Sequence, residues 1–360
     1  MLSNNETKCA SIKYLFLFNK IDIESLLTDK FDVKGDLENI FQFHLVLIIC
    51  SIFFRGVLHL SNELAFTRHQ GVNMFNVEFR LAAPLRWAMI GGGRGSQIGN
   101  IHRNAAQRYG LFNLVAGAFD VDAERCRDFG VAIGLDADRC YANYHEMFEC
   151  EAQREDGIQA VSIATPNCFH YEMTKAALEH GLHVVCEKPI TFTVAEAEEL
   201  KALAEEKNLA ICVTYGYTGH QILHQAREMV QRGEIGQVRV INTMYAHGWH
   251  NEEIEATSPG LKWRVTPAVA GPSYVLGDTG THAQYLAEFV TGEKLKRLCC
   301  MRQSFIESRA PLEDNAHVMM EYESGAVGTM WSLLSTVVPC TPIKSVWSVL
   351  KPLLSGGMSS

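Results

Sequence analysis

The sequence of 360 residues lacks a cysteine framework. Its 11 cysteines include no C-x-x-C pair, and only Cys299 and Cys300 are neighbours. An odd number of cysteines without regular spacing predicts reduced thiols in a cytosol-like compartment, most of them acting as small core residues. The common zinc-binding spacings are absent as well. We therefore expect a cytoplasmic protein without a metal site.

Basic residues are also scarce. The chain has 32 Lys and Arg against 41 Asp and Glu, which gives a net charge of −9 and a pI near 5.9. Surfaces that bind nucleic acids or anionic membranes need clustered positive charge, so we expect neither partner. The mean hydropathy of −0.02 is typical of a globular protein, and the length allows two domains with separate cores.

No apolar run reaches the roughly 20 residues that a membrane-spanning helix needs. The longest, Leu45–Phe54, is short for a span and begins too late for a secretory signal. Three alternatives remain: a weak membrane anchor, a packed helical appendage, or a segment foreign to the working protein. We favour the third, with translation starting at Met74 and residues 1–83 forming a leader outside the functional fold.

The stretch 86–120 organises the rest of the chain. Trp87 to Ile90 predicts a buried strand, and the glycines that follow allow a sharp turn and close approach of a ligand. A helix that begins near Ser96 would direct its free N–H groups at a pyrophosphate. After a second strand, Asp120 stands where an acid accepts hydrogen bonds from ribose hydroxyls. The third position of the glycine pattern is Ser96, so a glycine turn in another kind of α/β protein remains the alternative.

Three further apolar strands end on polar residues. Val161 to Ala164 leads into Thr165, Pro166 and Asn167, and His183 to Cys186 leads into Glu187 and Lys188. Thr193-x-x-Glu196 predicts a capping box at the start of a helix, and Leu209 to Thr214 returns as a strand. Ligands bind beyond the carboxyl ends of parallel strands, so residues 84–216 predict a doubly wound dinucleotide-binding domain. His170 begins a helix and is either a surface residue or a cofactor contact.

Residues 217–335 predict a second, α+β domain. Val238 to Trp249 is β-like, and Ala316 to Tyr322 and Ala326 to Leu333 flank a Ser-Gly turn typical of a hairpin. Between them, Asp278 and His282 are four residues apart, which places both side chains on one face of a helix. Histidine suits proton transfer near neutral pH.

These motifs resemble those of the glucose–fructose oxidoreductase, inositol dehydrogenase and rhizopine-catabolism (Gfo/Idh/MocA) family. The resemblance runs from about Leu85 to Trp331 and rests on GGGRGSQIG, the acid after the second strand, ATPN with its histidine, CEKP, and GDTGTHAQYLAEFVTG. It implies a Rossmann domain with a doubly wound parallel sheet, followed by an α+β domain with a mainly antiparallel open sheet. By the same resemblance, the second sheet is the oligomer surface of a dimer or tetramer.

The resemblance also implies an NAD(P)-dependent oxidoreductase that acts on a secondary hydroxyl of a sugar, glycoside or cyclic polyol. His282 would be the general base in oxidation, Asp278 would orient the substrate or the imidazole, and Lys188 would hydrogen-bond the reacting oxygen. The residues expected at the cofactor are Gly91, Gly93, Arg94, Gly95, Gln97, Ile98, Asp120, Thr165, Pro166, Asn167, His170, Glu187 and Lys188. The residues expected at the substrate are Tyr217, Tyr245, Trp249 and Arg264, each of which is alternatively a core or interface residue.

Asp120 favours NAD, because an acid repels the 2′-phosphate of NADP. Arg94 would attract that phosphate, so NADP stays possible. The chain departs from the family after Trp331, where residues 336–360 form an atypical tail and the second sheet is expected to be incomplete. Two rival interpretations are a non-catalytic regulator that binds nucleotide and sugar, and an inactive, truncated family member.

Overall fold

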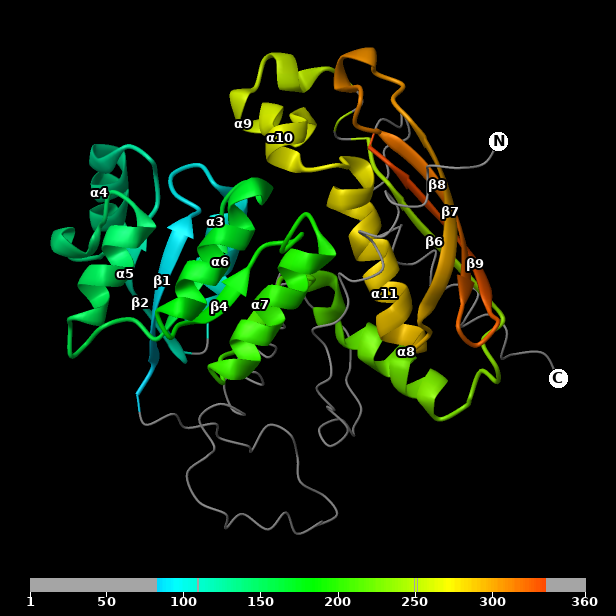
Figure 1. The fold of residues 1–360 in the computed structure, drawn as a ribbon, viewed down its shortest axis with the longest axis horizontal. Coiled ribbons are helices and arrows are strands. Elements are labelled where there is room, and N and C mark those ends of the chain that lie inside the picture. Colours follow the sequence, from blue (N-terminus) through cyan, green and yellow to red (C-terminus); the bar gives the residue numbers. More distant parts are fainter. Residues whose placement is uncertain (1–82, 109, 249, 251, 335–360) are drawn as a thin grey trace, which may run out of the picture.

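The computed structural model describes residues 83–334 except Tyr109, Trp249 and Asn251. Met74, nearly all of the leader and the tail at 336–360 lie outside the described residues, so the predictions about them stay predictions. Figure 1 shows two sheets, each flanked by helices. None of the helices in the described ranges combines the length and apolarity needed to span a membrane.

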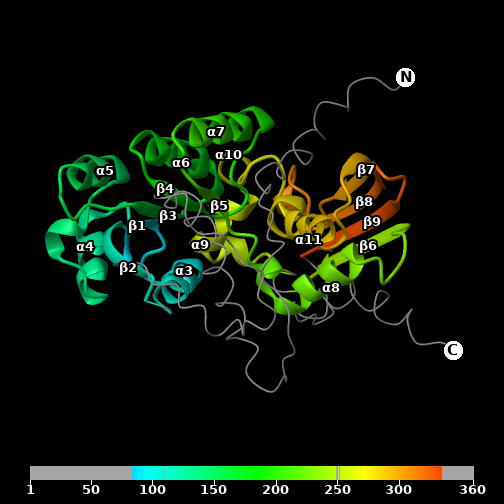
Figure 2. The same ribbon diagram turned by 90° about the horizontal axis from the view of Figure 1, so that it is seen from below.

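The first sheet is entirely parallel, in the order β2-β1-β3-β4-β5. Figure 2 shows α5, α6 and α7 on one face of it and α3 on the other. This confirms the predicted doubly wound sheet. Its strands are β1 (Leu85–Gly91), β2 (Phe112–Ala118), β3 (Ala160–Ala164), β4 (His183–Cys186) and β5 (Ile211–Val213). Its helices are α3 (Gln97–Gln107), α4 (Ala123–Ala132), η2 (Ala137–Arg139), α5 (Tyr144–Ala152), η3 (Asn167–Phe169), α6 (His170–Glu179) and α7 (Val194–Glu206).

Apolar strands form this sheet because both of its faces are covered. Ala88 and Ile90 pack toward one core, whereas Trp87 and Met89 pack toward the other. The predicted capping box at the start of α7 is present, with Thr193 and Glu196 exchanging hydrogen bonds. The strand order reverses at β1, because β2 lies on one side of it and β3 to β5 lie on the other. In such folds the ligand-binding crevice lies at the carboxyl ends of the two strands where the order reverses, here β1 and β3.

The second sheet has the order β6-β9-β8-β7, with β6 and β9 parallel and the other pairs antiparallel. A mainly antiparallel sheet is thereby confirmed. Its strands are β6 (Val240–Ala246), β7 (Leu295–Gln303), β8 (Asn315–Tyr322) and β9 (Val327–Leu333). The accompanying helices are η4 (Gly216–Gly219), α8 (Gln221–Gln231), η5 (Ile254–Ala256), α9 (Pro259–Lys262), η6 (Trp263–Val265), α10 (Pro267–Ala270), η7 (Leu276–Gly280), α11 (Thr281–Thr291) and η8 (Glu307–Arg309).

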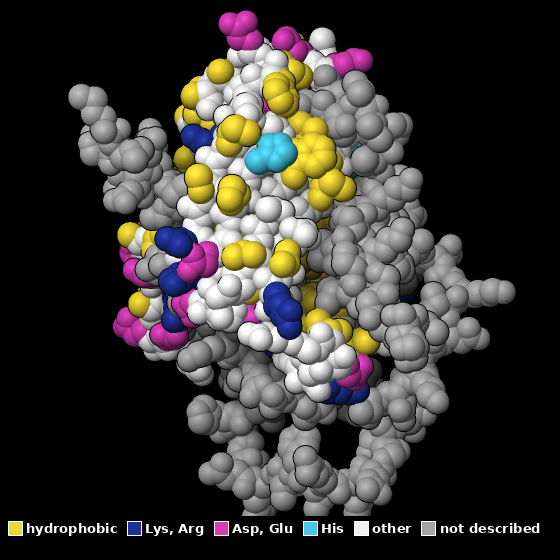
Figure 3. Space-filling model, turned by 90° about the vertical axis from the view of Figure 1, so that its right-hand side faces the viewer, with side chains coloured by type: hydrophobic (Ala, Val, Ile, Leu, Met, Phe, Trp, Pro, Cys, Tyr) yellow, Lys and Arg dark blue, Asp and Glu magenta, His cyan; other side chains and the backbone are white. Residues whose placement is uncertain are grey.

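Helix α11 covers one face of this second sheet, and α8 packs against α11 (Figure 1). The opposite face carries exposed apolar side chains, visible as scattered hydrophobic groups in Figure 3. Met319 and Met301 are 67% and 57% exposed, and Val240 and Val327 are 61% and 50% exposed. The predicted hairpin turn is confirmed, since Gly325 has a φ of 91° between β8 and β9.

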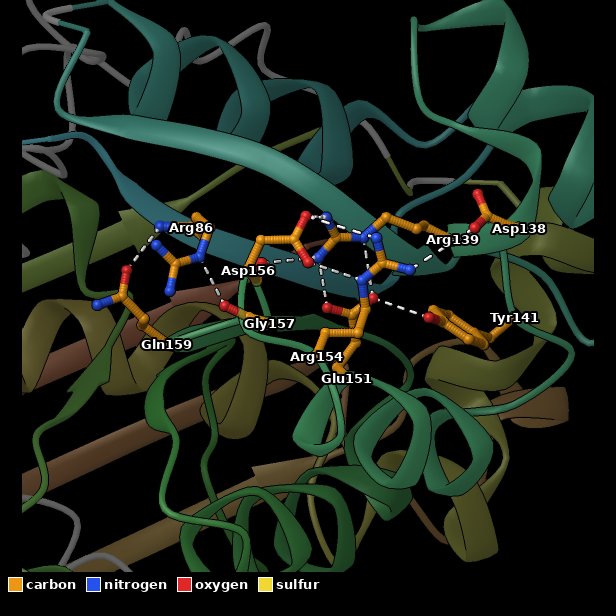
Figure 4. A network of polar contacts seen from close by, with 9 residues as sticks. All are labelled: Arg86, Asp138, Arg139, Tyr141, Glu151, Arg154, Asp156, Gly157 and Gln159. Atoms are coloured by element: carbon orange, nitrogen blue, oxygen red, sulfur yellow. Dashed lines mark hydrogen bonds and ion pairs between the residues drawn. The ribbon is translucent and has the colours of Figure 1, made fainter.

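A buried ion-pair network joins η2 to α5 in the segment between β2 and β3 (Figure 4). The Arg139 guanidinium binds the Glu151 carboxylate, and these side chains are 6% and 1% exposed. Tyr141 donates its hydroxyl hydrogen to Glu151 at 2.8 Å, and Arg139 also reaches the exposed Asp156 at 3.1 Å. Because both buried charges are paired, the network tolerates its low-dielectric surroundings.

Candidate active site

The glycine loop follows β1 and turns with positive φ angles of 70° at Gly91 and 67° at Gly92. A Cβ atom added to Gly93 would lie 2.7 Å from the carbonyl oxygen of Phe119, at the end of β2. The loop therefore lies directly against the neighbouring strand end, and larger residues are sterically excluded there.

The glycine that lets α3 pack against the loop is Gly99. A Cβ at Gly99 would lie 2.2 Å from the carbonyl oxygen of Gly92 and 2.4 Å from its Cα. Ser96, which we considered for the third position of the glycine pattern, is instead the N-cap, its Oγ accepting from the Gly99 N–H at 3.0 Å. In the sequence, Gly99 could have been recognised as the first glycine after Ser96.

The N-terminus of α3 faces solvent beside this loop. Arg94, Gly95, Gln97 and Ile98 are all exposed there, and Ile98 is 38% exposed despite its apolar side chain. The buried Arg103 guanidinium donates to the carbonyl oxygen of Gly92 at 2.6 Å and braces the loop from behind. Unpaired N–H groups at a helix start form an anion site.

Asp120 lies just beyond β2, where the sequence predicted a ribose contact. Its carboxylate accepts from Arg125 Nη2 at 2.7 Å and from Arg125 Nε at 3.1 Å. Arg125 holds the pKa of the Asp120 carboxyl below its usual range, helped by the backbone N–H of Asp122. The neighbouring Val121 is 96% exposed and offers an apolar surface. Sequence reasoning missed Arg125, because its pairing depends on the turn that starts α4.

The carboxyl end of β3 contacts both halves of the molecule. Thr165 lies against Gly91, and Asn167 donates its side-chain N–H to the carbonyl oxygen of Ala270 in α10 at 3.0 Å. Pro166 is partly buried between them. This edge of the nucleotide domain therefore borders the second domain.

His170 is fully buried, so its interpretation as a surface residue is wrong. Its Nδ1 lies 2.7 Å from the carbonyl oxygen of Pro189, and its Nε2 lies 2.9 Å from that of Thr165. Burial lowers the pKa of His170, and the two carbonyl contacts oppose that change. The ring joins the loops that follow β3 and β4; its contact with a cofactor stays a prediction.

Lys188 and Asp278 meet across the two domains. Lys188 Nζ lies 2.6 Å from Asp278 Oδ1 and 2.7 Å from the Asp278 carbonyl oxygen, and the two side chains are 14% and 25% exposed. Burial raises the pKa of Asp278, but the charges of Lys188 and Arg264 outweigh burial and leave it well below its usual range. Asp278 is therefore a carboxylate at neutral pH. Asp278 lies in the π-helical turn η7, immediately before α11.

His282 is the second residue of α11 and lies among aromatic rings. The ring centroids of Tyr217 and Tyr215 are 4.8 and 5.6 Å from its own, both nearly perpendicular, and that of Tyr245 is 6.4 Å away. Its Nδ1 is buried without a hydrogen-bond partner. Burial and then the charge of Lys188 lower the pKa of His282 to about 3, against the opposing carboxylates. The imidazole is therefore neutral at pH 7.

Only some of the predicted substrate residues lie next to His282. The hydroxyl groups of Tyr217 and Tyr245 are 2.5 Å apart beside His282. Arg264 stacks on Trp263 with its guanidinium 4.5 Å from the ring centroid, and its charge reaches Asp278. Trp249 lies outside the described residues.

Glu187 is bonded within the nucleotide domain. Its Oε1 accepts from Thr214 Oγ1 at 2.6 Å and from the ring of His102 at 2.9 Å. Sequence reasoning did not single out either partner, because both lie on other elements of the fold. Among the residues that the structure describes, no group of three His, Cys, Asp or Glu side chains is arranged to hold a metal ion.

The site thus combines a solvent-facing helix start, a lysine side chain paired with a carboxylate, and a neutral imidazole. The tight backbone packing at Gly93 and Gly99 is the arrangement expected of the glycine turn in a dinucleotide-binding fold. The unpartnered Nδ1 of His282 marks a buried polar group in the same region. A neutral imidazole accepts a proton, and a neighbouring ammonium stabilises negative charge on oxygen.

Two family models match the chain. The model described as an oxidoreductase family with an NAD-binding Rossmann fold matches residues 85–215, and the GFO/IDH/MocA C-terminal domain matches residues 223–341. An uncharacterized oxidoreductase, YfiI, from Bacillus subtilis (strain 168) is 58% identical over 262 residues, which cover 72% of this chain and 67% of that protein.

Two solved structures of an inositol dehydrogenase homolog from Azotobacter vinelandii are similar to this chain. The complex with NAD+ has a TM-score of 0.71, and the complex with NADH and myo-inositol has one of 0.68. Both are 56% identical and cover 72% of this chain; the match covers 67% and 66% of those chains. The matched region therefore spans about two thirds of these relatives.

Proposed function

This chain belongs to the GFO/IDH/MocA family of NAD-binding oxidoreductases, and on that premise we propose that His282 acts as the general acid/base in its reaction. The reaction would transfer a hydride between the nicotinamide cofactor and a secondary hydroxyl of a sugar, glycoside or cyclic polyol. The observation that carries the proposal is the Lys188–Asp278 contact beside the neutral His282. This contact supports a single polar site to which the first domain contributes Lys188 and the second contributes Asp278 and His282.

The residues around the glycine loop would hold the dinucleotide. The N–H groups at the start of α3 would bind the pyrophosphate, and Asp120 would accept from the ribose. Gly93 and Gly99 would let the loop and α3 pack closely enough to hold these groups in place. Asp120 favours NAD over NADP, whereas the exposed Arg94 would accommodate an additional phosphate. When bound, the nicotinamide supplies the acceptor for the hydride.

His282 would take the hydroxyl proton at Nε2, because its Nδ1 is closed off from solvent. Its lowered pKa keeps the imidazole free to accept that proton throughout the neutral range. Lys188 would donate to the reacting oxygen and stabilise the charge that develops on it. Asp278 would hold the Lys188 ammonium in place and orient a neighbouring hydroxyl. In reduction, the same imidazole would return the proton.

We take a cyclic polyol as the first substrate to test. Two tyrosine hydroxyls next to the imidazole offer hydrogen bonds, and their rings offer faces for the apolar side of a polyol ring. The inositol dehydrogenase homolog, at 56% identity, was solved with myo-inositol. Arg264 and Trp249 remain proposed contacts.

The experiment is NADH formation by the purified chain with NAD+ and a panel that includes myo-inositol and levoglucosan. His282→Gln should lower kcat by roughly 100- to 10,000-fold and leave NAD+ binding intact. His180→Gln, at an exposed histidine on the nucleotide domain, is the matched control and should behave as the wild type. Full turnover by His282→Gln would exclude the acid/base role. NAD+ binding by the wild type without turnover of any polyol would favour the regulator.

The exposed face of the second sheet is proposed as the oligomer surface (Figure 3). Its four exposed apolar side chains line a sheet face that no described helix covers. Light scattering of the wild type should give a dimer or tetramer, and Met319→Asp should shift it toward the monomer. A wild type that is monomeric at all concentrations would exclude this surface.

We propose a reducing, cytoplasmic location because the described cysteines carry free thiols. The cysteines in the part of the chain that the structure describes are all free, and Cys126, Cys186 and Cys212 are buried. Burial raises the pKa of Cys212 to about 12, so this thiol is unreactive in the folded state. Cell fractionation followed by immunoblotting tests the location.

A further inference from the structure

A buried histidine outside the predicted catalytic set contacts Glu187. His102 lies on α3, and its side chain is 3% exposed. Its Nε2 is 2.9 Å from Glu187 Oε1, and its Nδ1 is 2.5 Å from Ser162 Oγ on β3. Because a carboxylate oxygen only accepts, the hydrogen lies on Nε2, and His102 donates it to Glu187. The imidazole therefore links α3 to the middle of β3 and to the residue that follows β4.

Glu187 is held from several directions. Its Oε1 also accepts from Thr214 Oγ1 at 2.6 Å, and its Oε2 accepts from the Lys188 backbone N–H at 3.3 Å. Its own backbone N–H donates to Ile163 at 3.0 Å. Burial raises the pKa of Glu187, but hydrogen bonds from His102 and Thr214 and the charge of Lys188 lower it to about 2. The side chain is therefore a carboxylate with fixed donors.

Lys188 follows Glu187 directly and reaches the second domain. Its Nζ makes two contacts with Asp278, at 2.6 and 2.7 Å, and its side chain is 14% exposed. A hydrogen bond of this length fails if the donor moves by about 1 Å. If the Glu187 carboxylate moved, the backbone between Glu187 and Lys188 would shift with it. The Lys188 ammonium would then move away from Asp278.

We propose that His102 is a positioning residue whose Nε2–H fixes the Glu187 carboxylate and thereby holds the Lys188 ammonium against Asp278. The contact between Nδ1 and Ser162 only orients the ring. The kinetic consequence rests on the proposed function, whereas the geometric consequence does not. His102 also connects the helix that begins at the anion-binding loop with the turn that carries Lys188.

Two substitutions of His102 test the roles of its two ring nitrogen atoms separately. The amide nitrogen of glutamine reaches the position of Nε2, so His102→Gln keeps the donor to Glu187. The amide of asparagine reaches only the position of Nδ1, so His102→Asn loses that donor. Ser162→Ala removes the Nδ1 partner and leaves the donor in place. All three are measured as the full chain with NAD+ and myo-inositol.

We expect His102→Asn to lower kcat by about 10- to 100-fold, the value of a hydrogen bond to a charged group. The KM for NAD+ should stay within about threefold of the wild type, and His102→Gln and Ser162→Ala should retain kcat within about threefold. A purely structural role would instead lower the melting temperature and change kcat and KM together in both His102 variants.

Crystal structures of the two His102 variants give a readout that does not need turnover. Lys188 Nζ should leave Asp278 in His102→Asn and stay in contact in His102→Gln. An unmoved Lys188 in His102→Asn, or an equal loss of kcat in both variants, overturns the inference. If the wild type turns over no polyol, the proposed function fails, and the crystal structures still decide the positioning role.

Discussion

Gly99→Ala is the substitution for which the structure gives the most direct expectation. The added methyl group would lie 2.2 Å from the Gly92 carbonyl oxygen, whereas ordinary contact begins near 3.4 Å. The difference, 3.4 − 2.2, requires that α3 and the glycine loop separate by about 1.2 Å. The neighbouring atoms are backbone, so no side-chain rotation relieves the overlap. Overpacking of this kind costs about 1–3 kcal/mol of folding free energy.

The same displacement should weaken the binding of NAD+. Hydrogen bonds from the start of α3 to a phosphate work only over a few tenths of an ångström. Loss of one or two such bonds, at about 1.5 kcal/mol each, raises the Kd about 10- to 100-fold. At an NAD+ concentration 100 times the wild-type Kd, the ligand adds about 2.7 kcal/mol to the free energy of unfolding. A Kd raised 100-fold would reduce this increment to about 0.4 kcal/mol.

The assay is urea unfolding of the wild type and of Gly99→Ala, each with and without NAD+, together with calorimetric titration of NAD+. Gly260→Ala is the control, since a Cβ there would meet no atom within 4 Å. It should leave both the stability and the Kd unchanged. A Gly99→Ala protein that binds NAD+ with the wild-type Kd would refute the assignment of Gly99 as the glycine that seats the helix.

Three other predictions concern charges. Arg125→Ala should raise the ratio of the Kd for NADP+ to that for NAD+ about threefold, because Asp120 would then face the 2′-phosphate without a neighbouring cation. His282→Gln should flatten the fall in stability between pH 6.5 and pH 4. There the unfolded imidazole binds a proton that the folded one, with a pKa of about 3, does not, a difference of up to ~1.4 kcal/mol per pH unit. Glu151→Ala should cost about 3 kcal/mol, because it leaves the buried Arg139 without its main partner.

Each of these has a defined contrary outcome. Tighter binding of NADP+ by Arg125→Ala, measured by calorimetry, would mean that Asp120 does not face the 2′ position. Parallel stability-against-pH curves for the wild type and His282→Gln would mean that the folded imidazole titrates normally. For the ion pair, Asp156→Ala removes an exposed partner that is 58% accessible and should cost less than about 1 kcal/mol. Equal losses at Glu151 and Asp156 in denaturant unfolding would contradict the distinction between buried and exposed pairs.

Local sequence patterns were enough to predict the strands, the helices and the polar residues at their ends. Unbroken apolar runs indicated strands buried on both faces, and the structure has a parallel sheet there. Thr193 and Glu196 indicated a helix start because a capping box joins residues three apart. Asp278 and His282 were recognisable as a pair because residues four apart lie on one face of a helix and because their segment resembles a signature of the family. These signals act within one turn or one strand, so neighbouring residues suffice to specify them.

Contacts between residues far apart in the sequence could be read only from the fold. Lys188 and Asp278 are 90 residues apart and come into contact because the second domain lies against the carboxyl edge of the first sheet. The sequence left His170 as either a surface residue at a helix start or a cofactor contact, and only the fold shows that two loops enclose its ring. The role of Gly99 depends on the distance from α3 to the loop, and the donors to Glu187 come from α3 and the end of β5. Such contacts follow from the packing of whole elements, which no local sequence pattern records.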